Sequence, residues 1–324
     1  MSKTNILSPK IKISGAIGIK ILHNSNLNKK IFIFYDDHSN TKYCKINKSQ
    51  PKTNLFISEL FDTFSNEDVA MILEEPFIDS DSKIKILWED SEHLLLFRKF
   101  YTKLINKCSD KKICRLFPVD IRLSIFEISP DEIIFNISNP KPEYYIKLKI
   151  YFENIQFLFD LNEIKTISDP IIKFIKKVFN IYVETDFYKH LKKQLEEFTE
   201  KYQINSSDKT IYDTIKNNSH LSNFIYEEGF PFVSNHNNNF IDDLDKISSG
   251  IMELYSLILT LLLPNNNIIY FAGYYHSNNI AYILQKYYNF KLDFAYGMTD
   301  NIDRKNPKEI INCIEINKNY LNMI

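Results

Sequence analysis

The chain has 324 residues, of which 44% are hydrophobic and 14% aromatic, and its formal net charge is -1. A chain of this size and composition can bury a substantial core, which excludes wholesale disorder. The charge lacks the basic excess typical of nucleic-acid-binding proteins, so we expect no nucleic-acid partner. Isoleucine, asparagine and lysine are overused, as in proteins encoded by the AT-rich genomes of large DNA viruses or AT-rich microbes.

The cysteines and the apolar stretches bear on where the protein works. No two of the cysteines have the C-x-x-C spacing of a zinc ribbon or a redox motif. These cysteines are Cys44, Cys108, Cys114 and Cys313. Scattered free thiols are typical of a reducing compartment, so we expect a cytoplasmic protein, or one in the host cytoplasm or virion if it is viral. The most apolar stretch, 251–263, is shorter than the roughly 20 residues of a membrane span, and we expect none.

The first part of the chain reads as strands that alternate with helices. Residues 10–22 alternate well enough for a strand or hairpin, and 31–35 form the continuous apolar run of a buried parallel strand. Residues 51–64 carry apolar side chains at helical spacing, and 69–73 predict a second buried strand. Strand, helix and strand in this order predict a parallel βαβ unit.

The remainder of the chain is mainly helical until it returns to the sheet. A long helix is predicted over 83–107 and a third strand over 114–119. Residues 144–161 fit either paired strands or a helix, of which we favour the helix, and further helices are predicted over 169–180, 187–201 and 242–263. A strand from Ile268 then leads into a helix over 277–288, with Ser277 or Asn278 as its N-cap. The sequence thus predicts one α/β domain over residues 1–324, with a mostly parallel central sheet flanked by helices and a mainly helical insertion over 129–267.

Titratable residues follow the predicted strands at the point where each strand ends. Ligand-binding side chains of open α/β sheets gather beyond the carboxyl ends of such strands, so we expect these residues to share one site. In chain order they are Asp36, Asp37, His38, Glu74, Glu75, Asp120, Arg122 and His276. Each also has a structural explanation, such as a turn, a solvated strand end or an ion pair between Asp120 and Arg122.

Two histidines with carboxylates match the ligands by which a divalent metal of unknown identity activates water. The expected metal ligands are His38, Glu75, His276, Asp36 and Asp37. A strand-end acid would take the proton of the water, and an arginine would stabilise negative charge. The expected catalytic residues are His38, Glu74, His276 and Arg122. A metal-free alternative uses either histidine as general base, oriented by a glutamate.

Three short motifs carry a family resemblance: Tyr35–His38, Met71–Pro76 and Gly273–His276. Over residues 28–125 and 265–292 the chain resembles the superfamily of erythromycin esterases, TraB and TIKI proteins and ChaN-like haem-binding proteins. Its members have an early strand ending in a G-x-x-H-like motif, a strand ending in Glu, and a late G-x-x-H before a helix. The resemblance implies a metal-assisted hydrolase of an unknown small molecule or peptide, with His38, Glu74 or Glu75, and His276 as the site.

Two alternatives stay open. Tyr35 stands where this superfamily usually has glycine, which also fits a catalytically degenerate binding or structural protein of the same fold. A calcineurin-like metallophosphoesterase is the further alternative, because Asp36-x-His38 matches its first metal motif and Asn235-His236 resembles a later one. No Gly-Asp-x-x-Asp lies between these two motifs, so we place this alternative behind the others.

Overall fold

The computed structural model describes residues 10–37, 44, 54–56, 69–76, 116–125, 142–161, 167–205, 224–227, 230–233, 240–299 and 313–317. The chain divides into two compact units. The first consists of Met1–Val119 together with Leu259–Ile324, and the second of Asp120–Ile258.

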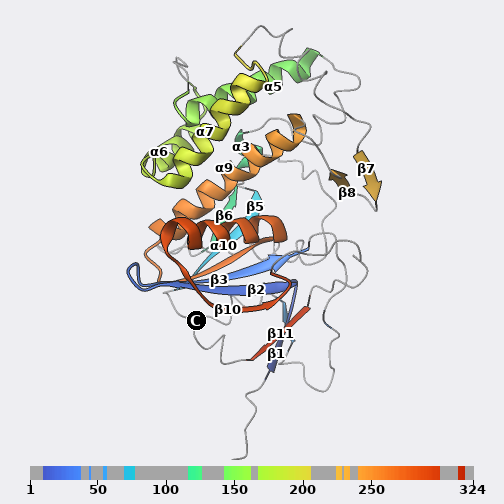
Figure 1. Cartoon of the computed structure of the whole chain (residues 1–324), viewed down its shortest axis with the longest axis vertical. Helices are drawn as coiled ribbons and strands as arrows, with labels where there is room; N and C mark the ends of the chain where they lie inside the picture. Colours follow the sequence, from blue (N-terminus) through green and yellow to red (C-terminus); the bar gives the residue numbers. More distant parts are fainter. Residues whose placement is uncertain are drawn as a thin grey trace, which may run out of the picture. The chain divides into compact units, whose positions relative to one another are not determined.

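A six-stranded mixed sheet forms the centre of the first unit (Figure 1). Its strands, in spatial order, are β10 (Lys291–Gly297), β2 (Gly18–Asn24), β3 (Lys29–Asp36), β9 (Asn267–Gly273), β5 (Val69–Pro76) and β6 (Leu116–Asp120). Strand β9 is parallel to both of its neighbours, β3 and β5. Strand β2 is antiparallel to both β3 and β10. With helices beside it, this sheet confirms the predicted α/β class.

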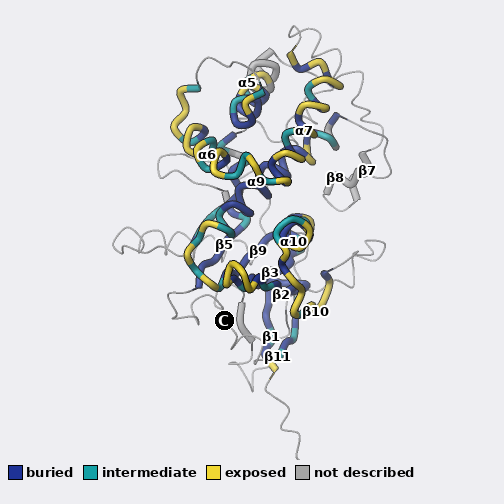
Figure 2. The backbone as a smooth tube through the Cα atoms, turned by 60° about the vertical axis from the view of Figure 1, so that its left-hand side comes forward, coloured by how far each residue is buried: buried dark blue, intermediate teal, exposed yellow. Residues whose placement is uncertain are grey.

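The central strands are strands because they are buried on both faces. All five residues of 31–35 are fully buried, and 268–272 are buried almost as completely (Figure 2). Burying a Val, Leu, Ile or Phe side chain contributes about 1.5–3 kcal/mol. A helix would expose one side of such a run, so the predicted strands over 31–35 and 69–73 are confirmed.

Helix α10 (Tyr274–Tyr288) packs on β3 and β9 (Figure 1). Its buried residues, such as Ile280 and Leu284, form one side of the helix, whereas Tyr282 is exposed. The helix begins three residues before the predicted 277, so the predicted N-cap is wrong. Gly273 is the N-cap, because β9 turns directly into the helix there.

A second sheet of three strands belongs to the same unit. Strand β1 (Lys10–Ser14) is antiparallel to β11 (Cys313–Asn317) and parallel to β4 (Asn54–Phe56). The predicted helix over 51–64 is therefore wrong for 54–56, where pairing with β1 outweighs the helical spacing. The rest of that segment, like the predicted helix over 83–107, lies outside the described residues.

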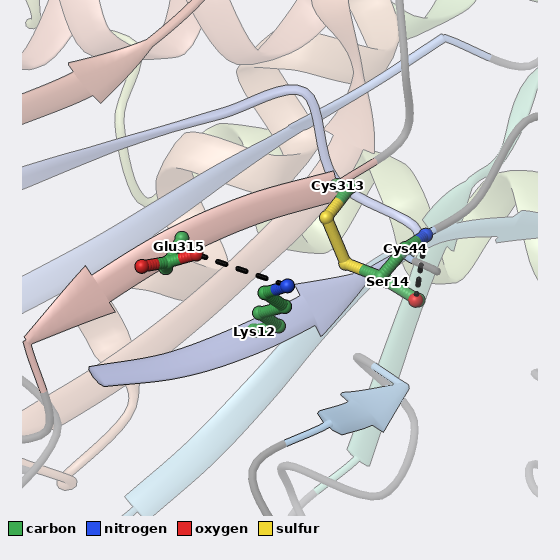
Figure 3. Close-up of a disulfide and its surroundings, with 5 residues drawn as sticks. All are labelled: Lys12, Ser14, Cys44, Cys313 and Glu315. Carbon is green, nitrogen blue, oxygen red and sulfur yellow. Dashed lines mark hydrogen bonds and ion pairs between the residues drawn. A yellow bond between two sulfur atoms is a disulfide. The ribbon is translucent and has the colours of Figure 1, made fainter. Parts of the chain in front are cut away.

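Cys44 and Cys313 form a disulfide, with their Cα atoms 4.8 Å apart (Figure 3). The expectation of free thiols is therefore wrong for Cys44 and Cys313. The other two cysteines lie outside the described residues. The pairing arises because β11 places Cys313 opposite Ser14, whose hydroxyl accepts a hydrogen bond from the N–H of Cys44 at 3.3 Å. The cysteine argument for a reducing compartment thereby loses its basis.

The second unit is mainly helical. Its elements are α3 (Arg122–Ile125), α5 (Pro142–Leu158), α6 (Pro170–Asn180), α7 (Asp186–Lys201), the antiparallel pair β7 (Phe224–Glu227) and β8 (Phe230–Val233), and α9 (Phe240–Leu262), whose last residues belong to the first unit. Rings of Phe152, Phe198, Tyr202 and Phe240 pack together inside this unit. None of the described helices is long and apolar enough to cross a membrane.

Candidate active site

The carboxyl ends of three neighbouring strands meet at one edge of the large sheet. Strands β3, β9 and β5 run parallel, and the register places Asp36 beside Gly273 and Leu73 beside Phe271. Glu74 and Glu75 therefore lie at the same edge, and His276 lies in the first turn of the helix that leaves β9. Four of the residues predicted from the sequence thus gather at this edge, where ligands of open α/β sheets bind.

Glu74 and His276 form the closest pair in this group. Nε2 of His276 lies 3.4 Å from Oε1 of Glu74, and the two side chains are 9% and 8% exposed. The other carboxylate oxygen of Glu74 accepts a hydrogen bond from the N–H of Gly273 at 2.7 Å. One oxygen of this carboxylate therefore holds the start of α10, and the other faces the imidazole.

The other two carboxylates at this edge belong to the opposite face of the sheet. Side chains alternate along a strand, and Phe34 and Leu73 belong to the core cluster that includes the three-stranded sheet. Asp36 and Glu75 follow them by two residues, are almost fully buried, and share their face. They are thus separated from the α10 face, on which Glu74 meets His276.

The other two predicted metal ligands are Asp37 and His38. Asp37 directly follows β3 and is half-buried, whereas His38 lies outside the described residues, as does the Asn235-His236 motif of the phosphoesterase alternative. Among the residues that the structure describes, no group of three or more His, Cys, Asp and Glu side chains could hold a metal ion. The predicted metal site therefore stays a prediction.

Arg122 belongs to the second unit, where it pairs with Asp120. Its Nε donates to Oδ1 of Asp120 at 2.7 Å, and Nη2 donates to Oδ2 at 2.9 Å. The backbone N–H of Arg122 also donates to Oδ1, at 3.2 Å. This two-pronged contact matches the structural explanation given above for the two residues. The catalytic role of Arg122 stays a prediction.

Two ring contacts involve the first turn of α10, which carries His276. Tyr35 is fully buried, with its ring 5.8 Å from that of Tyr274, and the ring of Tyr275 lies 5.5 Å from the imidazole of His276. Nζ of Lys20 lies 5.8 Å from the centre of the Tyr35 ring. Lys20 was not among the predicted site residues. Its position within the apolar run 17–22 was the signal that could have identified it as a buried lysine.

The chain matches no protein-family model, and neither a curated protein nor a solved structure is similar to it. The resemblance to the erythromycin esterase, TraB and TIKI superfamily therefore rests on the three short motifs and stays a prediction.

Proposed function

We propose that this protein is a hydrolase that activates water at the pair formed by Glu74 and His276. The observation that carries this proposal is the 3.4 Å contact between the imidazole and the carboxylate. The contact lies at the carboxyl edge of parallel strands, where the chemistry of open α/β sheets is concentrated. A base with an orienting acid is the arrangement that general-base catalysis requires.

In the proposed reaction, His276 takes a proton from water as the water attacks the substrate, and it then gives this proton to the leaving group as the scissile bond breaks. The carboxylate of Glu74 holds the ring in position and stabilises the imidazolium that forms. The hydrogen bond from the N–H of Gly273 keeps the carboxylate in place. The substrate class is a small molecule or peptide, as the family resemblance implies.

A divalent metal, which the resemblance implies, would supply a bound water of lowered pKa. Because Nε2 of His276 faces Glu74, Nδ1 is the atom that would bind such a metal. Asp36 and Glu75 do not fit the same coordination shell, since they belong to the other face of the sheet. We therefore derive no step through a metal.

Hydrolysis assays with ester, peptide and phosphate-ester substrates test the proposal. We expect His276→Ala to lower kcat/KM by about 10²–10⁴-fold, the usual contribution of general-base catalysis. His23→Ala is the matched control, because Nδ1 of His23 also meets a carboxylate, that of Asp293, at 2.5 Å. Equal hydrolysis by wild type and His276→Ala contradicts the proposal, as does a wild type inactive on all three classes. Elemental analysis of the purified protein tests whether a divalent metal is bound.

The second candidate is a binding or structural protein of the same fold. Packing favours it: the Tyr35 ring fills the space beside Tyr274, and the Tyr275 ring lies against His276. In such a protein the buried pair would hold α10 to the sheet. Leaving one buried polar group without its partner costs about 1–3 kcal/mol. An inactive wild type whose unfolding free energy drops by that amount in His276→Ala would favour this candidate.

A further inference from the structure

Ser277 attaches the first turn of α10 to two strands of the sheet. It directly follows His276 and is fully buried. Its Oγ lies 2.9 Å from the carbonyl oxygen of Phe34 in β3 and 2.9 Å from that of Ala272 in β9. A hydroxyl carries one proton, so it donates to one carbonyl at a time, or shares the proton between both.

This attachment matters because the cap residue of the helix contributes no side-chain hydrogen bond. Gly273 is the N-cap and has no side chain that could bond the free N–H groups of the first turn. Two hydrogen-bonding contacts fix the helix start to the sheet. Glu74 accepts from the N–H of Gly273, and the hydroxyl of Ser277 donates to a strand carbonyl. Both contacts involve residues within four positions of His276.

We infer that Ser277 is a positioning residue that sets the contact between His276 and Glu74. The imidazole and the hydroxyl leave the same helical turn, so the turn cannot rotate or shift without moving both. With the hydroxyl fixed to β3 and β9, Nε2 of His276 is held 3.4 Å from the carboxylate, which comes from β5. That this position of the His276 ring serves catalysis rests on the proposed function, whereas the role of Ser277 in fixing the ring does not.

The test is an NMR measurement of the His276 ring that needs no substrate. Among the seven histidines, the ring signals of His276 are assigned as those that disappear in His276→Ala. Glu74→Gln should shift these signals in the wild-type background. In a Ser277→Ala background we expect this response to fall to less than half. An undiminished response would overturn the inference.

Ser256→Ala is the matched control. Ser256 is also fully buried, and its Oγ donates to the carbonyl of Met252 at 2.9 Å within its own helix. This variant should keep the full response of His276 to Glu74→Gln. If it lowers the response as much as Ser277→Ala does, the effect is a general one of removing a buried hydroxyl, and the inference fails.

Ser277→Cys is the second variant, because it nearly keeps the shape of serine but provides a weak donor. If Ser277→Ala fails to fold, the reduced response should appear in Ser277→Cys, and a failure of both to fold shows a purely structural role that overturns the inference. Where hydrolysis is found, both variants should lower kcat with KM unchanged. A protein without hydrolysis contradicts the proposed function, whereas the NMR response decides on Ser277 separately.

Discussion

At the residue scale, the adjacent glutamates Glu74 and Glu75 differ in the face of the sheet to which they belong. The side chains of both are largely buried, and a buried carboxylate is costly unless it is hydrogen-bonded or paired. Glu74 meets this condition on the α10 face through His276 and Gly273. Glu75 belongs to the other face, so we expect it to influence the imidazole less than Glu74 does.

This difference gives a direct prediction for the two glutamates. We expect Glu74→Gln to lower hydrolysis about 100-fold or more, because the amide no longer stabilises an imidazolium. Glu75→Gln should lower hydrolysis less than about tenfold, because it changes a contact in the core and not the contact with the imidazole. Steady-state kinetics on both variants measure the effects, and a larger loss in Glu75→Gln would contradict the assignment of faces.

Asp243 in α9 gives a prediction of pH dependence. Burial alone would raise the pKa of Asp243, but hydrogen bonds from Lys201 and Tyr202 and the charges of Lys201 and Lys246 lower its pKa below the ordinary value. A lowered carboxyl pKa stabilises the fold above the unfolded-state pKa, and this stabilisation is lost as the pH falls through the folded-state value. We expect Asp243→Asn to cost about 1 kcal/mol at pH 7.

The cost of Asp243→Asn should disappear at a pH below the folded-state pKa of Asp243, where the wild-type carboxyl is protonated as well. Urea denaturation of both proteins at pH 7 and in acid measures this difference. An equal cost at both pH values would show that the charge of Asp243 is not the cause.

Some residues of the site could be predicted from the sequence and others could not. His276 and Glu74 could be predicted because each follows a buried strand, and parallel strands end at one edge. The choice between Glu74 and Glu75 could not, since it depends on the face that α10 covers. The sequence predicts Ser277 or Asn278 as the helix cap, and it gives no sign that Ser277 contacts the carbonyl of Phe34, 243 residues away in the chain.

At the element scale, secondary structure was predicted best for segments whose own apolar sequence shows that both faces are buried. The runs 31–35, 69–73 and 268–272 are strands because water reaches neither face. The prediction was worst at β4, which has three residues and exists through its pairing with β1. The start of α10 was placed three residues late because Gly273, which looks like the end of a strand, also serves as the cap.

Helix α6 offers a test at this scale. The carboxylate of Asp169 accepts hydrogen bonds from the N–H groups of Ile171 at 2.7 Å and Ile172 at 3.2 Å, and Pro170 occupies the first helical position. We expect Asp169→Ala to lower the unfolding free energy by about 0.5–2 kcal/mol. Asp169→Asn keeps an acceptor and should cost much less. Thermal denaturation compares the variants, and equal losses would mean that the cap bonds contribute nothing.

At the scale of the whole molecule, two contacts between distant segments complete the first unit. Strand β9 comes between β3 and β5, and the disulfide joins Cys44 to Cys313 across a separation of 269 residues. Neither could be predicted from the sequence, because local patterns carry no information on which distant segments pair. The α/β class could, since it depends on the order of buried runs and helices.

The disulfide gives a prediction for the stability of the whole chain. A cross-link that closes so long a loop restricts the unfolded state, and we expect its reduction to lower the unfolding free energy by about 3–5 kcal/mol. Denaturant titrations with and without reductant measure this loss. The double variant Cys44→Ser/Cys313→Ser should start at the lower stability and not respond to reductant. A full response in the double variant would assign the effect to the other cysteines.

The place of β9 also has a consequence for how the protein is made. A ribosome synthesises β3 and β5 long before Asn267–Gly273, so during translation the backbone N–H and C=O groups that later pair with β9 have no partner strand. Such unpaired strand edges invite pairing with other nascent chains. We therefore expect the emerging polypeptide to depend on chaperones until its late strand is released from the exit tunnel.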